Sequence, residues 1–209
     1  MKAGTRRGRP RKFDEDETLD QIMQVFWKHG YAATSLDQIC AATNLNRPSL
    51  YAAFGGKKDI YLKVVERFAD QVQSRLREAG RTAKGAKGRL KAIMAAAIDL
   101  YTGRTGLSGA PYGCLAISTL PSEAARDKDI QSALETVTAR MDKGFASLIR
   151  HEMQGAIVEE EIRTAAQLLA LMLHGLSIRA RAGEKPERLK QLAECAVDRI
   201  IPAASPETL

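Results

Sequence analysis

Histidine, cysteine and aromatic residues are scarce in this chain of 209 residues, which has three histidines and three cysteines. Cys40, Cys114 and Cys195 are far apart and form no Cys-x-x-Cys pair, which argues against a zinc site and against a secreted disulfide framework. No apolar run approaches the ~20 residues of a membrane span. The N-terminus is basic and lacks the apolar segment of a secretory signal. We therefore expect a cytoplasmic protein without a bound metal.

The sequence also lacks the residue patterns that most enzymes need. His29, His151 and His174 stand alone and belong to no His-Glu-x-x-His cluster. No nucleophile elbow, phosphate-binding Walker loop or dinucleotide fingerprint is present. We therefore expect neither catalysis nor a cofactor.

Positive charge is concentrated at the N-terminus. The chain has a net charge of +7, and residues 1–12 contain six Lys or Arg side chains and no acid. A basic arm of this kind usually binds phosphate.

Helical periodicity begins directly after this arm. Leu19, Ile22, Met23 and Phe26 follow the i, i+3, i+4, i+7 spacing of one apolar helical face. Acidic residues precede this face, and Gly30 follows it as a stop signal. The pattern predicts a helix over about 16–29.

Three further helices follow at short intervals. Ser35 and Gln38 fit a capping box that opens a helix ending near residue 42. Pro48 suits the first turn of a third helix, with Arg47 at or beside its cap, and Gly55-Gly56 ends it. A longer apolar helix begins at about Lys58.

The remainder is also helical, with no strand candidate and no internal repeat. Residues 75–91 are rich in Lys and Arg and are interpreted as a helix end and a solvated connector, or alternatively as a second nucleic-acid patch. Residues 104–113 are turn-rich. Helices are predicted over 88–103, 114–124, 127–153, 159–183 and 186–201.

Residues 34–54 combine a capped helix, a tight turn and a short second helix, which is the plan of a helix-turn-helix motif. In this motif the second helix lies in the DNA major groove with its N-terminal residues at the base edges. A helix of ~7 residues is roughly 10 Å long, which suits a groove about 12 Å wide.

The segment "TSLDQICAATNLNRPSLYAAFGGKKDIYLKVVERF" (34–68) resembles the N-terminal domain of tetracycline-repressor-like (TetR) transcriptional regulators. The shared features are the Thr-Ser opening, the Ser-Leu-Tyr-x-x-Phe motif and the glycine-lysine turn before an apolar helix. The rest of the chain matches only in its helical plan and size. The resemblance implies an all-α fold, with an N-terminal three-helix helix-turn-helix DNA-binding domain (13–72) after the arm (1–12). A C-terminal helical domain for ligand binding and dimerisation (73–209) would follow.

The resemblance also implies which residues contact DNA. Tyr51 and Lys57 would bind backbone phosphates, as would Thr34 and Ser35 at a helix start. Arg47 and Ser49 would face base edges, since arginine can pair bidentately with guanine. The family often has small or basic residues where Arg47-Pro48 stands here, so its base preference does not carry over. The complete helix-turn-helix set is Thr34, Ser35, Arg47, Pro48, Ser49, Tyr51 and Lys57.

The N-terminal arm carries a second DNA signal. "RGRP" (7–10) resembles the core of an AT-hook, whose arginines lie along the narrow minor groove of A·T-rich DNA. We interpret Arg7 and Arg9 as minor-groove or phosphate contacts. The alternative is a disordered solubilising tail.

The last two predicted helices are the candidates for a dimer interface. The segment 159–183 is apolar over much of its circumference, and such a helix needs neighbours on several sides. A palindromic site read by two short helices requires a homodimer. An intramolecular core is the alternative. The candidate interface residues are Leu169, Leu173, Leu176, Leu192, Ala196 and Ile200.

The middle helices would enclose a small-molecule effector, which we expect to be apolar from the residues available. An effector would release DNA by binding more tightly to a state with wider-spaced recognition helices. The candidate contacts, each also explicable as ordinary core, are Tyr101, Tyr112, Cys114, Ile117, Met141, Phe145 and Met172. Cys114 follows a glycine-rich loop at a helix start, which leaves open a thiol or electrophile sensor.

The leading hypothesis is a dimeric, ligand-responsive repressor that binds a palindromic operator. One alternative is an architectural or nucleoid DNA-binding protein that uses the RGRP arm, and another is a redox or electrophile sensor through Cys114. Repression or activation depends on operator position, which the chain does not encode. Nor does it encode the effector, the operator sequence or the regulated genes.

Overall fold

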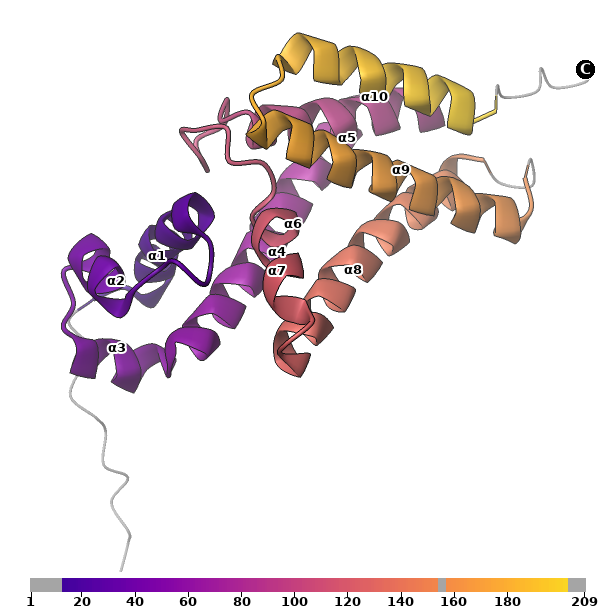
Figure 1. Ribbon diagram of the computed structural model, residues 1–209. Coiled ribbons are helices and arrows are strands. Elements are labelled where there is room, and N and C mark those ends of the chain that lie inside the picture. The colour runs from indigo at the N-terminus through magenta and orange to yellow at the C-terminus, as the bar shows by residue number, and fades with distance from the viewer. Residues whose placement is uncertain (1–12, 154–156, 203–209) are drawn as a thin grey trace, which may run out of the picture.

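Ten helices and no strand make up the part of the chain that the structure describes, residues 13–153 and 157–202 (Figure 1). The computed structural model therefore confirms the predicted all-α class. None of these helices has the length and apolar content that a membrane span needs. In chain order they are α1 (Glu15–His29), α2 (Leu36–Thr43), α3 (Arg47–Phe54), α4 (Lys57–Arg81), α5 (Gly85–Tyr101), α6 (Leu115–Thr119), α7 (Pro121–Ala124), α8 (Lys128–Glu152), α9 (Glu159–Arg181) and α10 (Pro186–Ile200).

Local capping explains where the first helices begin. The Asp14 carboxylate accepts N–H groups from Asp16 and Glu17, 2.8 and 3.1 Å away, so α1 starts one residue before its predicted start. The predicted capping box of α2 is present, with the Ser35 hydroxyl accepting from the Gln38 N–H and the Gln38 side chain accepting from the Ser35 N–H. Side-chain caps satisfy helix N–H groups that otherwise lack partners.

α4 is longer than its sequence pattern predicts. Residues 75–91 contain the predicted helix end, but the predicted connector is much shorter than expected. α4 continues to Arg81 and α5 already begins at Gly85, so only residues 82–84 join the two helices. Leu76 and Gly80 are buried within this stretch, and a Cβ on Gly80 would lie 3.1 Å from the Ile93 side chain. The basic residues therefore occupy the outer face of packed helices. The expected domain boundary at residue 72 falls inside this continuous helix.

One hydrophobic core runs from α1 through the middle helices to α10. At the N-terminal end, Trp27 packs edge-on against Phe68 with ring centroids 4.9 Å apart, and Phe26 packs edge-on against Tyr61 at 5.1 Å. In Figure 1, α1, α2 and α3 gather at one end of the molecule, while α9 and α10 lie at the other. α4 connects the two ends.

The predicted helix over 114–124 is two short helices instead of one. α6 ends at Thr119, and Pro121 begins α7. Proline lacks the N–H that a continuing helix would use, and it suits the first turn of a new helix. α6 still contributes to the core, because Leu115 and Ala116 have no exposed surface, and Leu120 between the two helices is equally buried.

α9 has two apolar faces, and this corrects the dimer prediction. Leu169, Leu173 and Leu176 are at most 1% exposed because the chain's own α5, α8 and α10 cover them. They belong to the intramolecular core and are not available to a partner. Ala196 of α10 is also buried, at 8% exposure, whereas Leu192 and Ile200 are half-buried.

The exposed apolar face of α9 lies on the opposite side of the helix. Leu168, Leu171 and Ile178 are 46, 65 and 60% exposed. With Gly175, whose missing side chain leaves open space, they recur at intervals of three, four and three residues. We call these four residues the outer α9 stripe.

Candidate nucleic-acid interface

α3 is a short helix set off by strong signals at both ends. Asn44 ends α2 in a left-handed conformation with φ 54°, and Asn46 caps α3 by accepting the Ser49 N–H at 2.9 Å. Gly55 ends the helix at φ 88°, where a Cβ would lie 2.6 Å from the Asp59 carboxylate. α2, a three-residue turn and α3 therefore form a helix-turn-helix.

The two faces of α3 are clearly divided. Leu50 and Phe54 are 1 and 2% exposed, so they pack the helix onto the core. Tyr51 is 50% exposed and is therefore not a core tyrosine. Arg47 and Pro48 of the first turn are also exposed, and Ser49 is half-buried. The surface of α3 thus presents polar side chains from its N-terminal turns.

Two residues predicted at the start of α2 have different environments. Ser35 is exposed and caps the helix. Thr34 is 1% exposed, and its hydroxyl donates to the Gly30 carbonyl at 2.6 Å. The prediction of a phosphate contact through the Thr34 side chain is therefore wrong. This threonine instead closes the turn between α1 and α2.

Lys57 lies at the first position of α4 and is held by the turn after α1. Its Nζ donates to the Ala32 carbonyl at 3.3 Å and lies 4.7 Å from the centre of the Tyr31 ring. Partial burial lowers the pKa of this ammonium group. The Lys57 ammonium group is therefore held in place by this hydrogen bond and by a cation–π interaction with the Tyr31 ring.

Arg47, the first residue of α3, forms an ion pair with Asp37 in the first turn of α2. Its Nε lies 3.0 Å from Asp37 Oδ1, and its Nη2 lies 2.8 Å from each carboxylate oxygen. Both side chains are more than half exposed. Sequence reasoning selected Arg47 but missed its partner.

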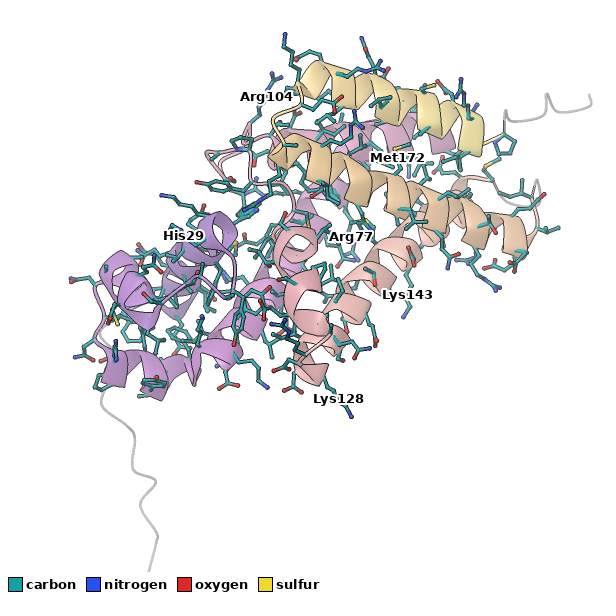
Figure 2. All side chains as sticks on the ribbon, in the orientation of Figure 1. His29, Arg77, Arg104, Lys128, Lys143 and Met172 are labelled. Carbon is teal, nitrogen blue, oxygen red and sulfur yellow. The ribbon has the colours of Figure 1, made fainter. Side chains whose placement is uncertain are left out.

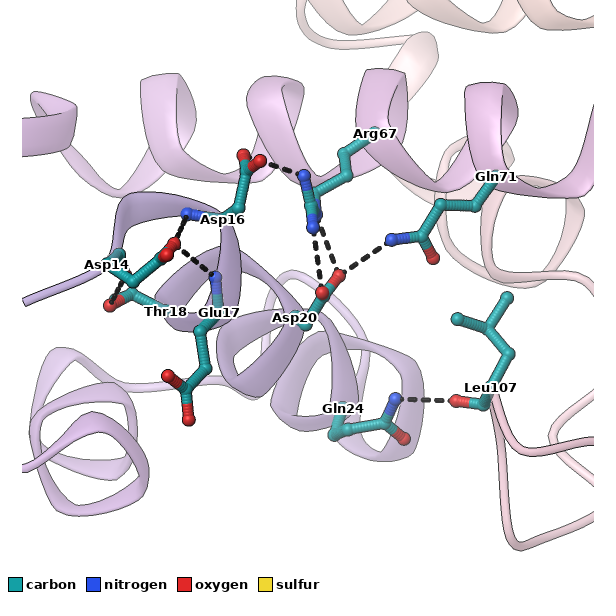
Figure 3. A network of polar contacts seen from close by, with 9 residues as sticks. All are labelled: Asp14, Asp16, Glu17, Thr18, Asp20, Gln24, Arg67, Gln71 and Leu107. Atoms are coloured by element: carbon teal, nitrogen blue, oxygen red, sulfur yellow. Dashed lines mark hydrogen bonds and ion pairs between the residues drawn. The ribbon is translucent and has the colours of Figure 1, made fainter. Parts of the chain in front are cut away.

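A polar network joins α1 to α4 (Figure 3). Asp20 accepts Nε and Nη2 of Arg67, each at 2.7 Å, and also the Gln71 amide at 2.8 Å. Its hydrogen bond with Arg67 lowers the pKa of Asp20. The Gln24 amide on the same helix donates to the Leu107 carbonyl at 2.8 Å. α1 is thereby bonded both to α4 and to the loop after α5.

The segment 112–114 ties α1 to α9. The Trp27 indole donates to the Gly113 carbonyl at 3.1 Å, and the Cys114 N–H donates to the Ser177 hydroxyl at 2.7 Å. Arg181 donates to the Tyr112 carbonyl at 2.8 Å. Gly113 has φ 70°, and a Cβ there would meet the Ser177 carbonyl at 2.7 Å.

A third set of bonds holds the start of α4 against α6 and α8. Buried Tyr61 forms a 2.5 Å hydrogen bond with the Thr119 hydroxyl. Lys58 pairs with Asp127 at 3.1 Å and Asp129 at 2.6 Å. Figure 2 shows Lys128, which lies between these two acids in sequence, at the tip of α8. The start of α4, which follows α3 after two residues, is therefore bonded to α6 and to the start of α8.

The predicted effector contacts all belong to, or pack against, one core cluster. Tyr101, Cys114 and Phe145 are buried. The other four are half-buried, among them Met172, which Figure 2 labels on α9. The half-buried members are Tyr112, Ile117, Met141 and Met172.

Cys114 does not have the environment of a reactive thiol. Burial raises its pKa to about 11, although backbone N–H groups at the start of α6 act in the opposite direction. A thiol with that pKa is protonated at neutral pH, whereas reactive cysteines are exposed and carry lowered pKa values. Burial of Cys114 therefore disfavours the activated thiol that the sensor alternative requires.

Sequence reasoning also missed a groove of about 230 Å³ between α4, α5 and the following loop. Val72 and Leu76 of α4 contribute apolar surface. Arg104, labelled in Figure 2, also lines the groove. Its Nη2 donates to the Glu187 carboxylate of α10 at 2.8 Å. None of the predicted effector residues lines the groove. Its full lining is Val72, Arg75, Leu76, Ala96, Asp99, Leu100, Arg104 and Thr105.

The remaining predicted contacts, Arg7 and Arg9, lie outside the described residues. Among the residues that are described, no group of three or more His, Cys, Asp or Glu side chains is arranged to hold a metal ion.

Comparison with known proteins agrees with this geometry. Residues 19–64 match the family model "Bacterial regulatory proteins, tetR family". The HTH-type transcriptional repressor ComR of Escherichia coli (strain K12) is 31% identical over 191 residues, covering 90% of this chain and 89% of ComR. The repressor BdcR of the same organism is 24% identical over 193 residues and covers 92% of each chain.

A solved structure shows the same arrangement of helices. The regulator CifR, solved as a cysteine mutant in complex with a 26-bp double-strand operator DNA, has a TM-score of 0.77 and 27% sequence identity. The alignment covers 90% of this chain and 98% of CifR.

Proposed function

The chain belongs to the TetR family of bacterial regulatory proteins, whose members are DNA-binding regulators and not enzymes, and we propose that it binds a palindromic operator as a homodimer. We further propose that it acts as a repressor and that a small-molecule effector releases it from the operator. The observation that carries the proposal is α3, a capped eight-residue helix whose apolar side is buried while its N-terminal polar side is exposed.

α3 has the length and anchoring that a recognition helix needs. Eight residues give a helix of about 12 Å, close to the width of the major groove. Its first turn would face base edges through Arg47 and Ser49. Tyr51, Ser35 and Lys57 would contact phosphates and fix the register of the motif on the duplex.

The outer α9 stripe supports a two-fold homodimer. Exposed Leu168, Leu171 and Ile178, with Gly175 between the last two, recur at intervals of three, four and three residues, a spacing that packs helix against helix. Its occupant is a second copy, because the same stripe on both chains forms the self-complementary contact of a C₂ dimer. Leu192 and Ile200 of α10 are half-buried and can extend this contact.

α4 provides a mechanical connection from an effector to α3. Its first turn follows α3 after only two residues, and its later turns line the α4–α5 groove. We propose that the effector is an apolar molecule that binds near Cys114, among the half-buried residues Tyr112, Ile117, Met141 and Met172. Its binding would shift α6 and α4. Because Tyr61 and Lys58 bond α4 to α6 and the start of α8, such a shift would change the separation of two recognition helices.

Selection of DNA from a random duplex library by the purified full chain tests the proposal. The expected product is an inverted repeat with half-site centres about 34–36 Å apart, or a multiple of that distance. An architectural protein using the RGRP arm would instead enrich A·T-rich duplexes without two-fold symmetry. A footprint without clear discrimination between specific and non-specific DNA would also favour that alternative.

Effector release is tested with the single tryptophan. Trp27 is fully buried and bonded to Gly113 at the junction of α1 with the rest of the chain. A compound that dissociates the operator complex should also change Trp27 fluorescence. Release without any change at Trp27 would contradict transmission through this junction.

A further inference from the structure

Asp37 is an acidic residue at a place where a DNA-binding surface would not favour one. It lies in the first turn of α2, beside the first residue of α3, and its side chain is 73% exposed. A carboxylate near DNA phosphates is repelled by them. Its presence beside α3 therefore requires a compensating role.

Stability provides only a small part of that role, because an exposed acidic residue in the first turn of α2 complements the helix dipole only weakly. The N-terminus of α2 is already capped in both directions by Ser35 and Gln38. The ion pair with Arg47 is exposed to solvent, and ion pairs of that kind contribute little to folding. The function of Asp37 must therefore be sought in what it does to Arg47.

The contacts show which edge of the guanidinium is occupied. Asp37 Oδ1 accepts from Nε at 3.0 Å and from Nη2 at 2.8 Å, so it lies against the Nε–Nη2 edge, and Oδ2 also accepts from Nη2 at 2.8 Å. The Nη1 hydrogens and the second Nη2 hydrogen remain available. Together they form the end-on pair of parallel donors that can reach O6 and N7 of one guanine.

We propose that Asp37 is a specificity-determining positioning residue. It holds the Nε–Nη2 edge of the Arg47 guanidinium, so that the Nη1–Nη2 edge reads a guanine in each operator half-site. This inference rests on the proposed operator binding. A free arginine side chain samples many rotamers. The ion pair with Asp37 excludes most of these rotamers of Arg47 before DNA binds. The pair also neutralises Asp37, so its charge does not repel the phosphates.

The geometry distinguishes positioning from masking. A carboxylate that blocked Arg47 would have to occupy the Nη1–Nη2 edge, which is the edge that faces a guanine in bidentate pairing. Every contact with Asp37 involves Nε or Nη2 and none involves Nη1. Arg47 can therefore bind Asp37 and a base at the same time.

The test compares base preference in four proteins: the wild type, Asp37→Ala, Arg47→Ala and the double variant. Each is measured against the selected operator and against operators with each G·C pair replaced symmetrically by A·T. We expect the wild type to lose roughly 100-fold in affinity at one symmetric pair of positions, about 10-fold for each half-site. Arg47→Ala should abolish this preference, and Asp37→Ala should reduce it to within about threefold.

Glu66→Ala is the matched control. Glu66 is exposed on α4 and makes no ion pair among the described residues, so its removal changes the net charge equally without touching Arg47. It should strengthen binding to all duplexes slightly and leave the base preference intact. Thermal unfolding of every variant checks that the fold is unchanged.

The outcomes are distinct. If Asp37→Ala keeps the full guanine preference and only binds all duplexes more tightly, Asp37 is merely a repulsive charge and the inference fails. An unchanged base preference in Arg47→Ala would also overturn it. In both cases the wild type still selects an inverted repeat, so the proposed function stands. If the wild type selects no inverted repeat, the proposed function fails and the inference fails with it.

Discussion

Replacing Leu171 with glutamate should separate the proposed dimer without unfolding the chain. Leu171 is the most exposed member of the outer α9 stripe, at 65%. Full burial of a leucine contributes ~1.5–3 kcal/mol, so covering the exposed part in a partner contributes roughly 1–2 kcal/mol. Each chain of a two-fold dimer contributes one Leu171, so the dimer loses about 2–4 kcal/mol of association free energy. That loss raises the dimer Kd by roughly 30- to 1,000-fold, before any cost of burying carboxylates.

Sedimentation equilibrium over a range of concentrations measures this shift. Thermal unfolding should show little change for the isolated chain, because surface substitutions are usually within about 0.5 kcal/mol. Ser74→Glu, at an exposed position of α4, adds the same charge away from the stripe and should leave the Kd unchanged. A Leu171→Glu chain that still dimerises with the wild-type Kd would refute the assignment of this face.

Four further predictions concern single groups and the N-terminal arm. Tyr51→Phe should weaken binding to all duplexes by about fivefold per half-site, the loss of one hydrogen bond of ~1 kcal/mol, with base preference unchanged in a fluorescence-anisotropy titration. Asp20 has a lowered folded pKa, so its contribution to stability is present above its unfolded pKa of about 3.9 and is lost as pH falls through the lower folded value. Asp20→Asn should therefore flatten the pH dependence of unfolding below about pH 4, and an unchanged acid profile would contradict the network. Cys114 should resist a maleimide at neutral pH in the native chain and react after unfolding in guanidinium. Mass spectrometry of the labelled peptide measures both reactions. Rapid labelling of the native chain would instead support the thiol-sensor hypothesis. Deleting residues 1–12 should weaken operator binding and flatten its salt dependence, and an unchanged slope of log K against log salt would contradict phosphate contact by the arm.

The sequence carried the local features of the N-terminal motif. The capping box of Ser35 and Gln38, the proline in the first turn of α3 and the glycine at its end are signals that act within a few residues. Such signals determine where a helix starts and stops largely independently of the rest of the chain. The predicted bounds of α1, α8 and α10 agree with the structure within about one residue. Within the N-terminal motif, the Thr34 side chain lies elsewhere than expected, because it is buried.

Features that depend on distant parts of the chain could not be read in the same way. Periodicity shows that α9 is apolar on several sides, but packing against α5, α8 and α10 decides that Leu173 faces inward and Leu171 outward. The length of α4 depends likewise on burial of Leu76 and on the close fit of Gly80 to Ile93. The pairing of Asp37 with Arg47 needs the angle between α2 and α3, which no local pattern reports.

The most direct test of the central claim is a photo-crosslink from α3 to DNA. A benzophenone amino acid at Tyr51, in the full chain bound to its selected duplex, marks the nucleotides that this helix approaches. We predict two crosslinks related by the two-fold axis, one in each half-site, with two chains on each duplex. A single crosslinked site, or none on a duplex that the chain demonstrably binds, would contradict the claim that α3 reads DNA in two copies.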